Sequence, residues 1–259
     1  MSTITAGIDA GTKTIKTVLI EDNTSISNSI LNLDKESTDE SVRGSLNQVL
    51  RESAVSGDAV KYIMVTGAGG RFVSLANGFT PEFVCLCRGM ERVNPNVRTI
   101  LDIGSDKTLV VRCVHGIPLR VERNDRCAAG TGRFLERVSE TLKVPLDQMQ
   151  EFAREERERL EIQNTCAVFA ESEIISLIHQ KKSPEDIMKG VLRSLALRIY
   201  TQLLEVGLEK EIAMTGGVAK NRGLSMALEK RVNARIYVPS NPEMIAALGA
   251  GIIAQGKVR

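Results

Sequence analysis

The sequence of 259 residues contains no tryptophan, and aromatic residues make up only 3% of it. Proteins that hold single-stranded nucleic acid stack bases on exposed aromatic rings, so this scarcity argues against such a role. Basic and acidic residues nearly balance, with a net charge of +2. That balance favours neither a nucleic acid backbone nor an anionic membrane as a partner. We therefore expect no nucleic acid and no membrane among the partners.

Long apolar segments are also missing. No run approaches the roughly 20 residues that span a bilayer, and the N-terminus lacks the basic-then-apolar pattern of a signal peptide. We expect a cytoplasmic protein. The five cysteines are an odd number, which in an unsecreted chain argues against a disulfide framework. The length allows one large domain or two small ones.

Two stretches of the chain repeat one pattern. A strand that runs into Asp-x-Gly-(Ser/Thr) occurs at Asp9 and again at Asp102, and a later strand that runs into Thr-Gly occurs at Thr66 and at Thr215. This indicates an internal duplication. The Asp and the Thr-Gly lie 57 residues apart in the first copy and 113 in the second. The second copy therefore carries an insertion, about as long as the stretch from Cys127 to Gln180.

Apolar patterns and turn signals predict an α/β fold. Strands are expected at residues 4–8, 15–20, 60–65, 97–103, 109–114 and 212–214, a turn at 23–25, and helices at 38–53, 134–142, 242–255 and after Cys166. Cys85 and Cys87, two residues apart, are expected to share one face of a strand. With Cys113 they are interpreted as small core residues. His115 and His179 have no motif around them and are expected at the surface or in local packing.

The Asp-x-Gly-(Ser/Thr) pattern suits phosphate binding. Glycine allows close approach of the backbone, the hydroxyl donates a hydrogen bond, and the carboxylate offers Mg²⁺ a hard oxygen. We expect Asp9 and Asp102 to hold Mg²⁺ and water, and Lys16 to neutralise phosphate charge. The residues expected around the nucleotide are Gly11, Thr12, Lys13, Lys16, Gly104, Ser105, Gly216, Gly217, Val218, Lys220 and Asn221.

These segments resemble the phosphate-1, phosphate-2 and adenosine motifs of the actin, sugar-kinase and acetate-kinase superfamily. The resemblance implies a duplicated ribonuclease-H-like (actin/sugar-kinase) fold that binds ATP between two domains. The first domain is expected in residues 1–96 plus 243–259. The second is expected in residues 97–242, with a cysteine-bearing helical insertion at about 124–182. The small-residue helix near the C-terminus would cross back to the first domain.

Cys127 and Cys166 each lie at or just before the start of a predicted helix. The helix dipole and free amides there favour a thiolate. A cuboidal iron–sulfur cluster needs four thiolates, which two chains related by a two-fold axis would supply. Spacing alone leaves this open, because 39 residues separate the two and no C-x-x-C motif is present. Two ordinary buried thiols are the alternative.

The residues around these cysteines, 124–135 and 165–173, resemble a narrower family: the activator components of 2-hydroxyacyl-CoA dehydratases and the ATPase subunits of benzoyl-CoA reductases. The likeness extends from Gly7 to the C-terminal helix. It implies a homodimer with ATP/ADP, Mg²⁺ and one [4Fe–4S] cluster held by Cys127 and Cys166 of both chains. Reduced ferredoxin or flavodoxin would donate the electron, and a 2-hydroxyacyl-CoA dehydratase or related iron–sulfur reductase would accept it.

The sequence departs from that family after Asp102. The usual Gly-Gly-Gln-Asp run is replaced here by residues 104–107, Gly-Ser-Asp-Lys. Asp106 either takes over the catalytic task of positioning the attacking water or pairs with Lys107. Two other functions stay open. One is a small-molecule kinase of the same superfamily, in which the cysteines have no role, and the other is a regulator that senses ATP.

Overall fold

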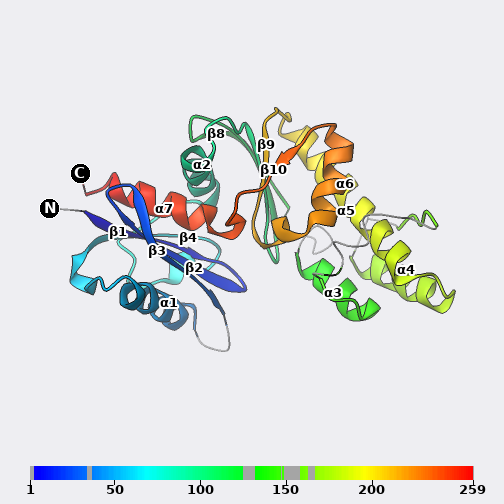
Figure 1. The fold of residues 1–259 in the computed structure, drawn as a ribbon, viewed down its shortest axis with the longest axis horizontal. Coiled ribbons are helices and arrows are strands. Elements are labelled where there is room, and N and C mark those ends of the chain that lie inside the picture. The colour runs from blue at the N-terminus through cyan, green and yellow to red at the C-terminus, as the bar shows by residue number, and fades with distance from the viewer. Residues whose placement is uncertain are drawn as a thin grey trace. The chain divides into compact units, whose positions relative to one another are not determined.

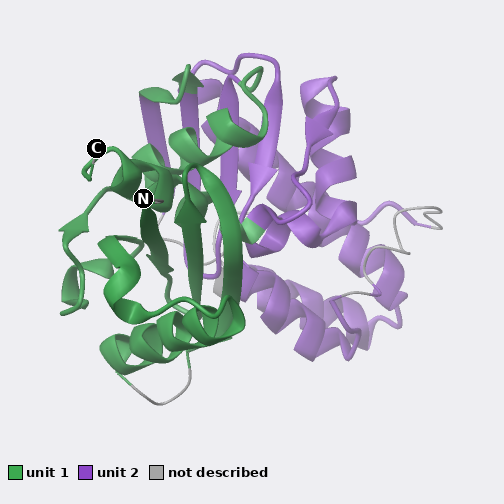
Figure 2. Ribbon diagram, turned by 60° about the vertical axis from the view of Figure 1, so that its left-hand side comes forward, with its two compact units in different colours: residues 1–97, 113–119, 243–259 green, residues 98–112, 120–242 purple. Residues whose placement is uncertain are grey.

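The computed structural model describes residues 3–33, 37–124, 132–146, 148, 158–162 and 167–258. The chain forms two compact units, coloured separately in Figure 2. Unit 1 comprises residues 1–97, 113–119 and 243–259, and unit 2 comprises residues 98–112 and 120–242. Each unit contains a five-stranded sheet. Among the described residues, no helix is long and apolar enough to cross a membrane.

The sheet of unit 1 has the strand order β3-β2-β1-β4-β5 (Figure 1). Its strands are β1 (Ile4–Ala10), β2 (Thr14–Glu21), β3 (Thr24–Asn32), β4 (Val60–Thr66) and β5 (Gly78–Phe79). The helices of unit 1 are α1 (Thr38–Glu52), α2 (Glu82–Val93) and α7 (Ile245–Gln255), with short 3-10 helices η1 (Gly57–Ala59) and η2 (Gly70–Phe72). Strand β1 runs antiparallel to β2 and parallel to β4.

Alternate residues of β2 bury against helices on opposite faces of the sheet, as strand geometry requires. Leu19 packs in a cluster with Val49 of α1, whereas Val18 packs with Ala247 of α7. The sheet is therefore covered on both faces, and only the strand ends and edges are available for a ligand.

Helix α7 explains the small residues near the C-terminus. A Cβ added at Gly7 of β1 would lie 2.1 Å from the carbonyl oxygen of Ala247, and one at Gly249 would lie 1.8 Å from that of Cys85. Helix α7 thus contacts backbone on both β1 and α2, which only glycine permits. The predicted helix over 242–255 is confirmed as 3-10 helix η6 (Pro242–Met244) followed by α7, and both Glu243 and α7 belong to unit 1.

The second sheet has the order β10-β9-β6-β7-β8 and belongs to unit 2, except for residues 113–119 at the β7–β8 hairpin. Its strands are β6 (Thr99–Ile103), β7 (Thr108–Val114), β8 (Ile117–Asn124), β9 (Ile212–Thr215) and β10 (Ile236–Tyr237). The helices are α3 (Gly132–Leu142), α4 (Ala167–His179), α5 (Pro184–Glu205) and α6 (Arg222–Val232), with 3-10 helix η5 (Gly217–Lys220). Helices α3, α4, α5 and α6 share one apolar core with β6 and β9.

The two sheets repeat one topology. Taken from β8, the order β8-β7-β6-β9-β10 matches β3-β2-β1-β4-β5. Strand β6 also runs antiparallel to β7 and parallel to β9, as β1 does to β2 and β4. The duplication inferred from the two Asp-x-Gly motifs is confirmed, and with it the duplicated α/β fold.

Two expectations about local structure were wrong. Cys85 and Cys87 lie in helix α2, not on a strand, although both are buried with Cys113 as expected. Pro81 is the N-cap of this helix. A short apolar run such as the one around these cysteines does not by itself distinguish a strand from a buried helix. Strands β3 and β8 were not predicted; β3 begins at Thr24, inside the predicted turn.

Candidate functional site

Asp9 and Lys16 face each other across the first hairpin. They are register partners in the β1–β2 pair, and Lys16 Nζ lies 3.0 Å from Asp9 Oδ2. The other carboxylate oxygen of Asp9, Oδ1, is buried and has no hydrogen-bond partner among the described residues. An unpaired buried carboxylate oxygen is costly, so Asp9 Oδ1 is a candidate ligand for an ion or a hydrogen-bond donor.

Gly67 leaves the space in front of that oxygen open. Its φ is +88°, and a Cβ at this position would lie 2.4 Å from Asp9 Oδ1. Any other residue would therefore fill the position that a ligand of Asp9 needs, besides adopting a backbone conformation that favours glycine.

In the second copy, the equivalent carboxylate, that of Asp102, has a different hydrogen-bond partner. Asp102 occupies the position of Asp9, but its register partner on β7 is Leu109, where β2 has Lys16. Thr215 Oγ1 donates a hydrogen bond of 2.8 Å to Asp102 Oδ1, and both side chains are buried. One aspartate thus lies against an ammonium group, and the other is oriented by a hydroxyl.

The turns after the two aspartates have equal length and the same closing hydrogen bond. Gly11 N donates to Thr14 O at 3.1 Å, and Gly104 N donates to Lys107 O at 3.0 Å. Within the second turn, Ser105 Oγ is buried without a partner in the described part of the chain. A phosphate oxygen is the kind of acceptor that this hydroxyl lacks.

The segment after β9 turns sharply against β6. Gly216 has a φ of +81°, and a Cβ there would lie 2.4 Å from the carbonyl oxygen of Ile103. Val218 is buried, whereas Gly217 and Lys220 are exposed. The side chain of Asn221 caps α6, because its Oδ1 accepts from Leu224 N at 3.0 Å. Asn221 is therefore the N-cap of α6 through its side-chain oxygen.

Helix α3 begins directly on the turn after Asp102. Gly132 N donates to Gly104 O and Arg133 N donates to Ser105 O, both at 2.9 Å. The guanidinium of Arg133 holds Asp106 with two bonds, Nε–Oδ1 at 2.7 Å and Nη2–Oδ2 at 3.2 Å. The contact of Asp106 with Arg133 was not predicted, since nothing in the sequence links positions 27 residues apart.

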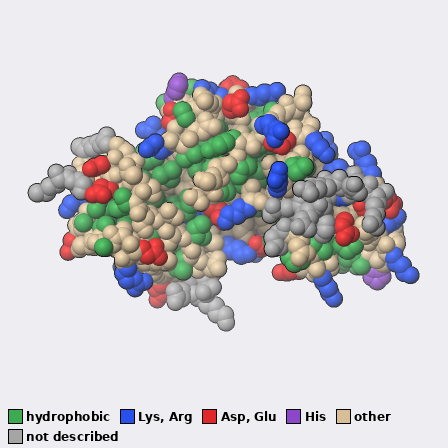
Figure 3. Space-filling model, in the orientation of Figure 1, with side chains coloured by type: hydrophobic (Ala, Val, Ile, Leu, Met, Phe, Trp, Pro, Cys, Tyr) green, Lys and Arg blue, Asp and Glu red, His purple; other side chains and the backbone are tan. Residues whose placement is uncertain are grey.

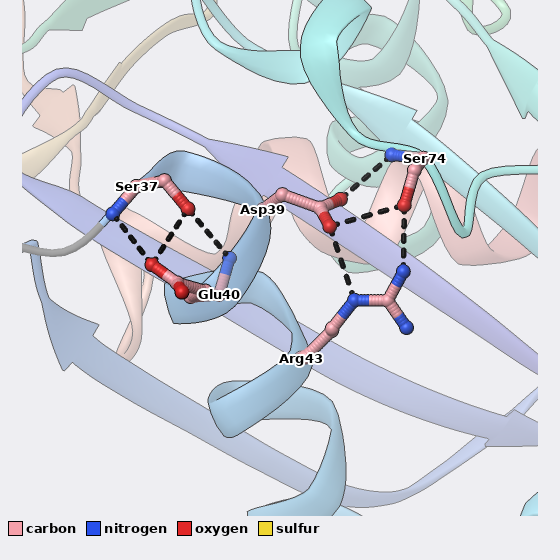
Figure 4. A network of polar contacts seen from close by, with 5 residues as sticks. All are labelled: Ser37, Asp39, Glu40, Arg43 and Ser74. Atoms are coloured by element: carbon pink, nitrogen blue, oxygen red, sulfur yellow. Dashed lines mark hydrogen bonds and ion pairs between the residues drawn. The ribbon is translucent and has the colours of Figure 1, made fainter.

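In unit 1, the segment that follows β4 is bound to helix α1 through Ser74 and Asp39. Figure 4 shows Asp39 accepting hydrogen bonds from Ser74 N at 2.7 Å, Ser74 Oγ at 3.0 Å and Arg43 Nε at 3.0 Å. The backbone amide of Ser74 and then Arg43 hold the pKa of Asp39 below its usual value. Ser37 and Glu40 form a capping box at the start of α1 in the same view. This network also went unpredicted.

The described cysteines are poor metal ligands. Burial raises the pKa of the Cys85 thiol to about 12, and a hydrogen bond with Cys113 together with burial raises the pKa of Cys87. Such thiols stay protonated, whereas a metal binds the thiolate. In the described ranges, no group of three or more His, Cys, Asp or Glu residues could hold a metal ion. Cys127 and Cys166 lie outside those ranges.

The predicted nucleotide residues gather at corresponding strand ends of the two sheets. In unit 1 these are Asp9, Gly11, Thr12, Lys13 and Lys16; in unit 2 they are Asp102, Gly104, Ser105, Asp106, Gly216, Gly217, Val218, Lys220 and Asn221. Figure 3 shows basic and acidic side chains interspersed on the face drawn, without one large patch of either sign. The arrangement suits a small phosphate ligand better than an extended polyanion.

The model of the BadF/BadG/BcrA/BcrD ATPase family matches residues 6–254. The chain belongs to this family. It is 33% identical over 258 residues to the (R)-2-hydroxyglutaryl-CoA dehydratase activating ATPase of Acidaminococcus fermentans, covering 99% of both chains. It is 35% identical over 252 residues to the activator of lactoyl-CoA dehydratase of Anaerotignum propionicum, covering 96% of both.

Solved structures place this ATPase fold in a wider group. The activator of the 2-hydroxyisocaproyl-CoA dehydratase from Clostridium difficile with bound ADPNP superposes with a TM-score of 0.91 at 30% identity, covering 99% of this chain and 95% of that one. ROK hexokinase from Thermus thermophilus shares the fold alone, with a TM-score of 0.56 at 13% identity over 99% and 100% of the chains. The predicted family and sugar-kinase-like fold are both confirmed.

Proposed function

We propose that this ATPase is an ATP-driven one-electron donor that activates a 2-hydroxyacyl-CoA dehydratase or a related iron–sulfur reductase. Similarity to dehydratase activators over nearly the whole chain is the observation that carries the proposal. In this account the protein is a cytoplasmic homodimer with one [4Fe–4S] cluster, reduced by ferredoxin or flavodoxin. ATP hydrolysis makes transfer of the electron to the acceptor effectively one-way.

The described residues fit a magnesium nucleotide. Asp9 Oδ1 and Ser105 Oγ are buried polar atoms that lack partners in the described structure, and the glycine turns leave room beside them. Mg²⁺ would neutralise charge on the phosphates, held through water by Asp9 and Asp102. Lys16 would add a fixed positive charge, and Ser105 would donate to a phosphate oxygen.

We assign Asp102 to orienting the attacking water. The ammonium of Lys16 lies 3.0 Å from Oδ2 of Asp9, so this carboxylate already serves a cation. Asp102 faces Leu109 in the hairpin and is oriented by Thr215. A carboxylate whose orientation is fixed by a hydrogen bond can direct a water molecule toward a phosphate.

The cluster ligands in this proposal are Cys127 and Cys166, which precede helices of one packed body. Cys127 lies five residues before Gly132, and Cys166 immediately precedes α4. Helices α3 and α4 share the apolar core of unit 2, and Arg137 Nη2 lies 2.6 Å from Glu171 Oε2 to join them. The cluster, when bound, supplies the one-electron chemistry.

The segment before Cys166 is also anchored. Lys182 Nζ lies 2.6 and 2.8 Å from the two carboxylate oxygens of Glu158, and Arg193 donates to the carbonyl of Leu160. Gly190 lets this segment cross α5 closely, since a Cβ there would lie 2.8 Å from the same carbonyl oxygen. These contacts fix Leu160 against α5 and Glu158 against Lys182, in the last described segment before Cys166 in the sequence.

Anaerobic reconstitution with iron and sulfide tests the ligand assignment. The wild type should bind about four irons per dimer, and Cys127→Ser or Cys166→Ser should lose the cluster. Cys113→Ser is the matched control, because its buried thiol has no part in the proposal, and it should retain the cluster. A Cys127→Ser protein that still assembles one intact cluster per dimer would contradict the assignment.

A further inference from the structure

We propose that Arg133 and Asp106 are positioning residues that transmit the state of the phosphate-binding turn, residues 104–107, to helix α3. The inference rests on the proposed nucleotide site, but it requires no cluster. It names a specific mechanical link and gives Asp106 a task different from water activation.

The link begins with Ser105, which has two roles at once. Its hydroxyl is buried without a partner within the described ranges, while its carbonyl accepts a hydrogen bond of 2.9 Å from Arg133 N. A phosphate oxygen that accepts a hydrogen bond from the Ser105 hydroxyl therefore binds the same residue whose carbonyl holds the start of α3. A rotation or displacement of Ser105 upon ligand binding would move the hydrogen-bond acceptor of the Arg133 amide.

The start of α3 depends on this turn for its hydrogen bonds. The first amides of a helix have no partner within the helix. Here the amides of Gly132 and Arg133 are satisfied by the carbonyls of Gly104 and Ser105. The first turn of α3 is therefore held to residues 104–105 by two backbone hydrogen bonds.

The ion pair between Arg133 and Asp106 fixes the orientation of α3 relative to the turn. Two hydrogen bonds fix the guanidinium of Arg133 on Asp106, at 2.7 and 3.2 Å, and such paired bonds constrain orientation as well as distance. Gly132 also lies against the third motif, since a Cβ there would lie 3.0 Å from Val218 Cγ2 and 3.1 Å from Gly104 O. The first turn of α3 thus touches two of the three nucleotide segments.

Amide hydrogen exchange of the full-length protein, with and without ADPNP, tests the link. In the wild type, ADPNP should slow exchange of the Gly132 and Arg133 amides by about fivefold or more, the lower end of ordinary coupling between sites. Arg133→Gln and Asp106→Asn should lose that response, and Arg133→Lys should keep part of it. Arg133→Gln should still bind ADPNP.

Glu171→Gln is the matched control, because it removes the other ion pair of α3, the one with Arg137. Its exchange should rise equally with and without ADPNP, so the nucleotide response is retained. An unchanged ADPNP response in Arg133→Gln overturns the link, as does a response lost equally in Glu171→Gln. ADPNP binding is measured on the same samples: a wild type that binds none overturns the nucleotide site as well, whereas binding without an α3 response overturns the link alone.

Discussion

The hydroxyl of Thr215 donates a 2.8 Å hydrogen bond to Oδ1 of Asp102, joining the ends of two adjacent strands. The equivalent carboxylate in the first copy, that of Asp9, is bound by an ammonium group instead. The aspartate of the repeated motif thus contacts the side chain of Lys16 in the first copy and that of Thr215 in the second. In our proposal, the first copy neutralises phosphate charge and the second orients water.

Thr215→Val should lower the rate of ATP hydrolysis by about tenfold, since the lost hydrogen bond to a charged group is worth roughly 1.5–3 kcal/mol and leaves Asp102 less well oriented. Steady-state ATPase assays measure this. Thr5→Val is the control: it removes a buried hydroxyl that donates to Gly251 O at 3.2 Å. It should cost about 1 kcal/mol of stability and leave the turnover number unchanged. Equal turnover in both variants would argue against the role of Thr215.

Lys16→Met should weaken ADPNP binding by about ten- to a hundredfold, the size expected for loss of one charge-assisted hydrogen bond. The methionine keeps most of the apolar stem, so packing changes little. Isothermal titration at two salt concentrations measures the effect, and the difference from wild type should shrink as salt rises. An affinity within twofold of wild type would show that Lys16 serves Asp9 alone.

Gly67→Ala should destabilise the protein by about 1–3 kcal/mol, because it combines a positive φ with a Cβ placed against the Asp9 carboxylate. Gly44→Ala is the opposite case. Gly44 lies within α1, and its Cβ would meet only Leu31 Cδ2 at 3.8 Å, so this change should add about 0.5–1 kcal/mol. Urea unfolding distinguishes the two. Similar effects of both substitutions would contradict the geometry described for Gly67.

Asp39→Asn should reduce stability at neutral pH but make little difference in acid. The pKa of Asp39 is lowered in the folded state from 3.8, so its ionised form stabilises the fold above that value. The contribution disappears as the pH falls through the lowered folded pKa. Unfolding free energies of wild type and variant should therefore differ at pH 6 and converge as the pH falls through the lowered folded pKa of Asp39. A difference that persists or grows in acid would contradict the network around Ser74.

Much of the fold follows from the sequence. The buried strands β1, β4, β6 and β9 are short apolar runs that end in Asp-x-Gly or Thr-Gly, and the repetition of those endings is enough to predict the duplication. Strands β3 and β8 escaped prediction because both lie at sheet edges. Their residues are largely polar or exposed, so the alternation that marks a half-buried strand is weak.

The contacts that organise the site were less predictable. Arg133 meets Asp106, and Asp39 meets Ser74, across sequence separations that no periodicity encodes. Asn221 stays a predicted nucleoside residue, and its side-chain oxygen in addition caps α6, a role that its position before an apolar helix also indicates. Residue types and motifs thus identified the strand ends that matter, whereas the partners of each side chain depend on the packed fold.

The most direct measurement of the central claim is electron paramagnetic resonance of anaerobically purified, dithionite-reduced protein with and without ATP, alongside its iron content and mass in solution. Our account predicts a dimer with about four irons and a cluster spectrum that changes when ATP is added. A colourless, iron-free monomer, or a cluster spectrum that ignores ATP, would contradict it.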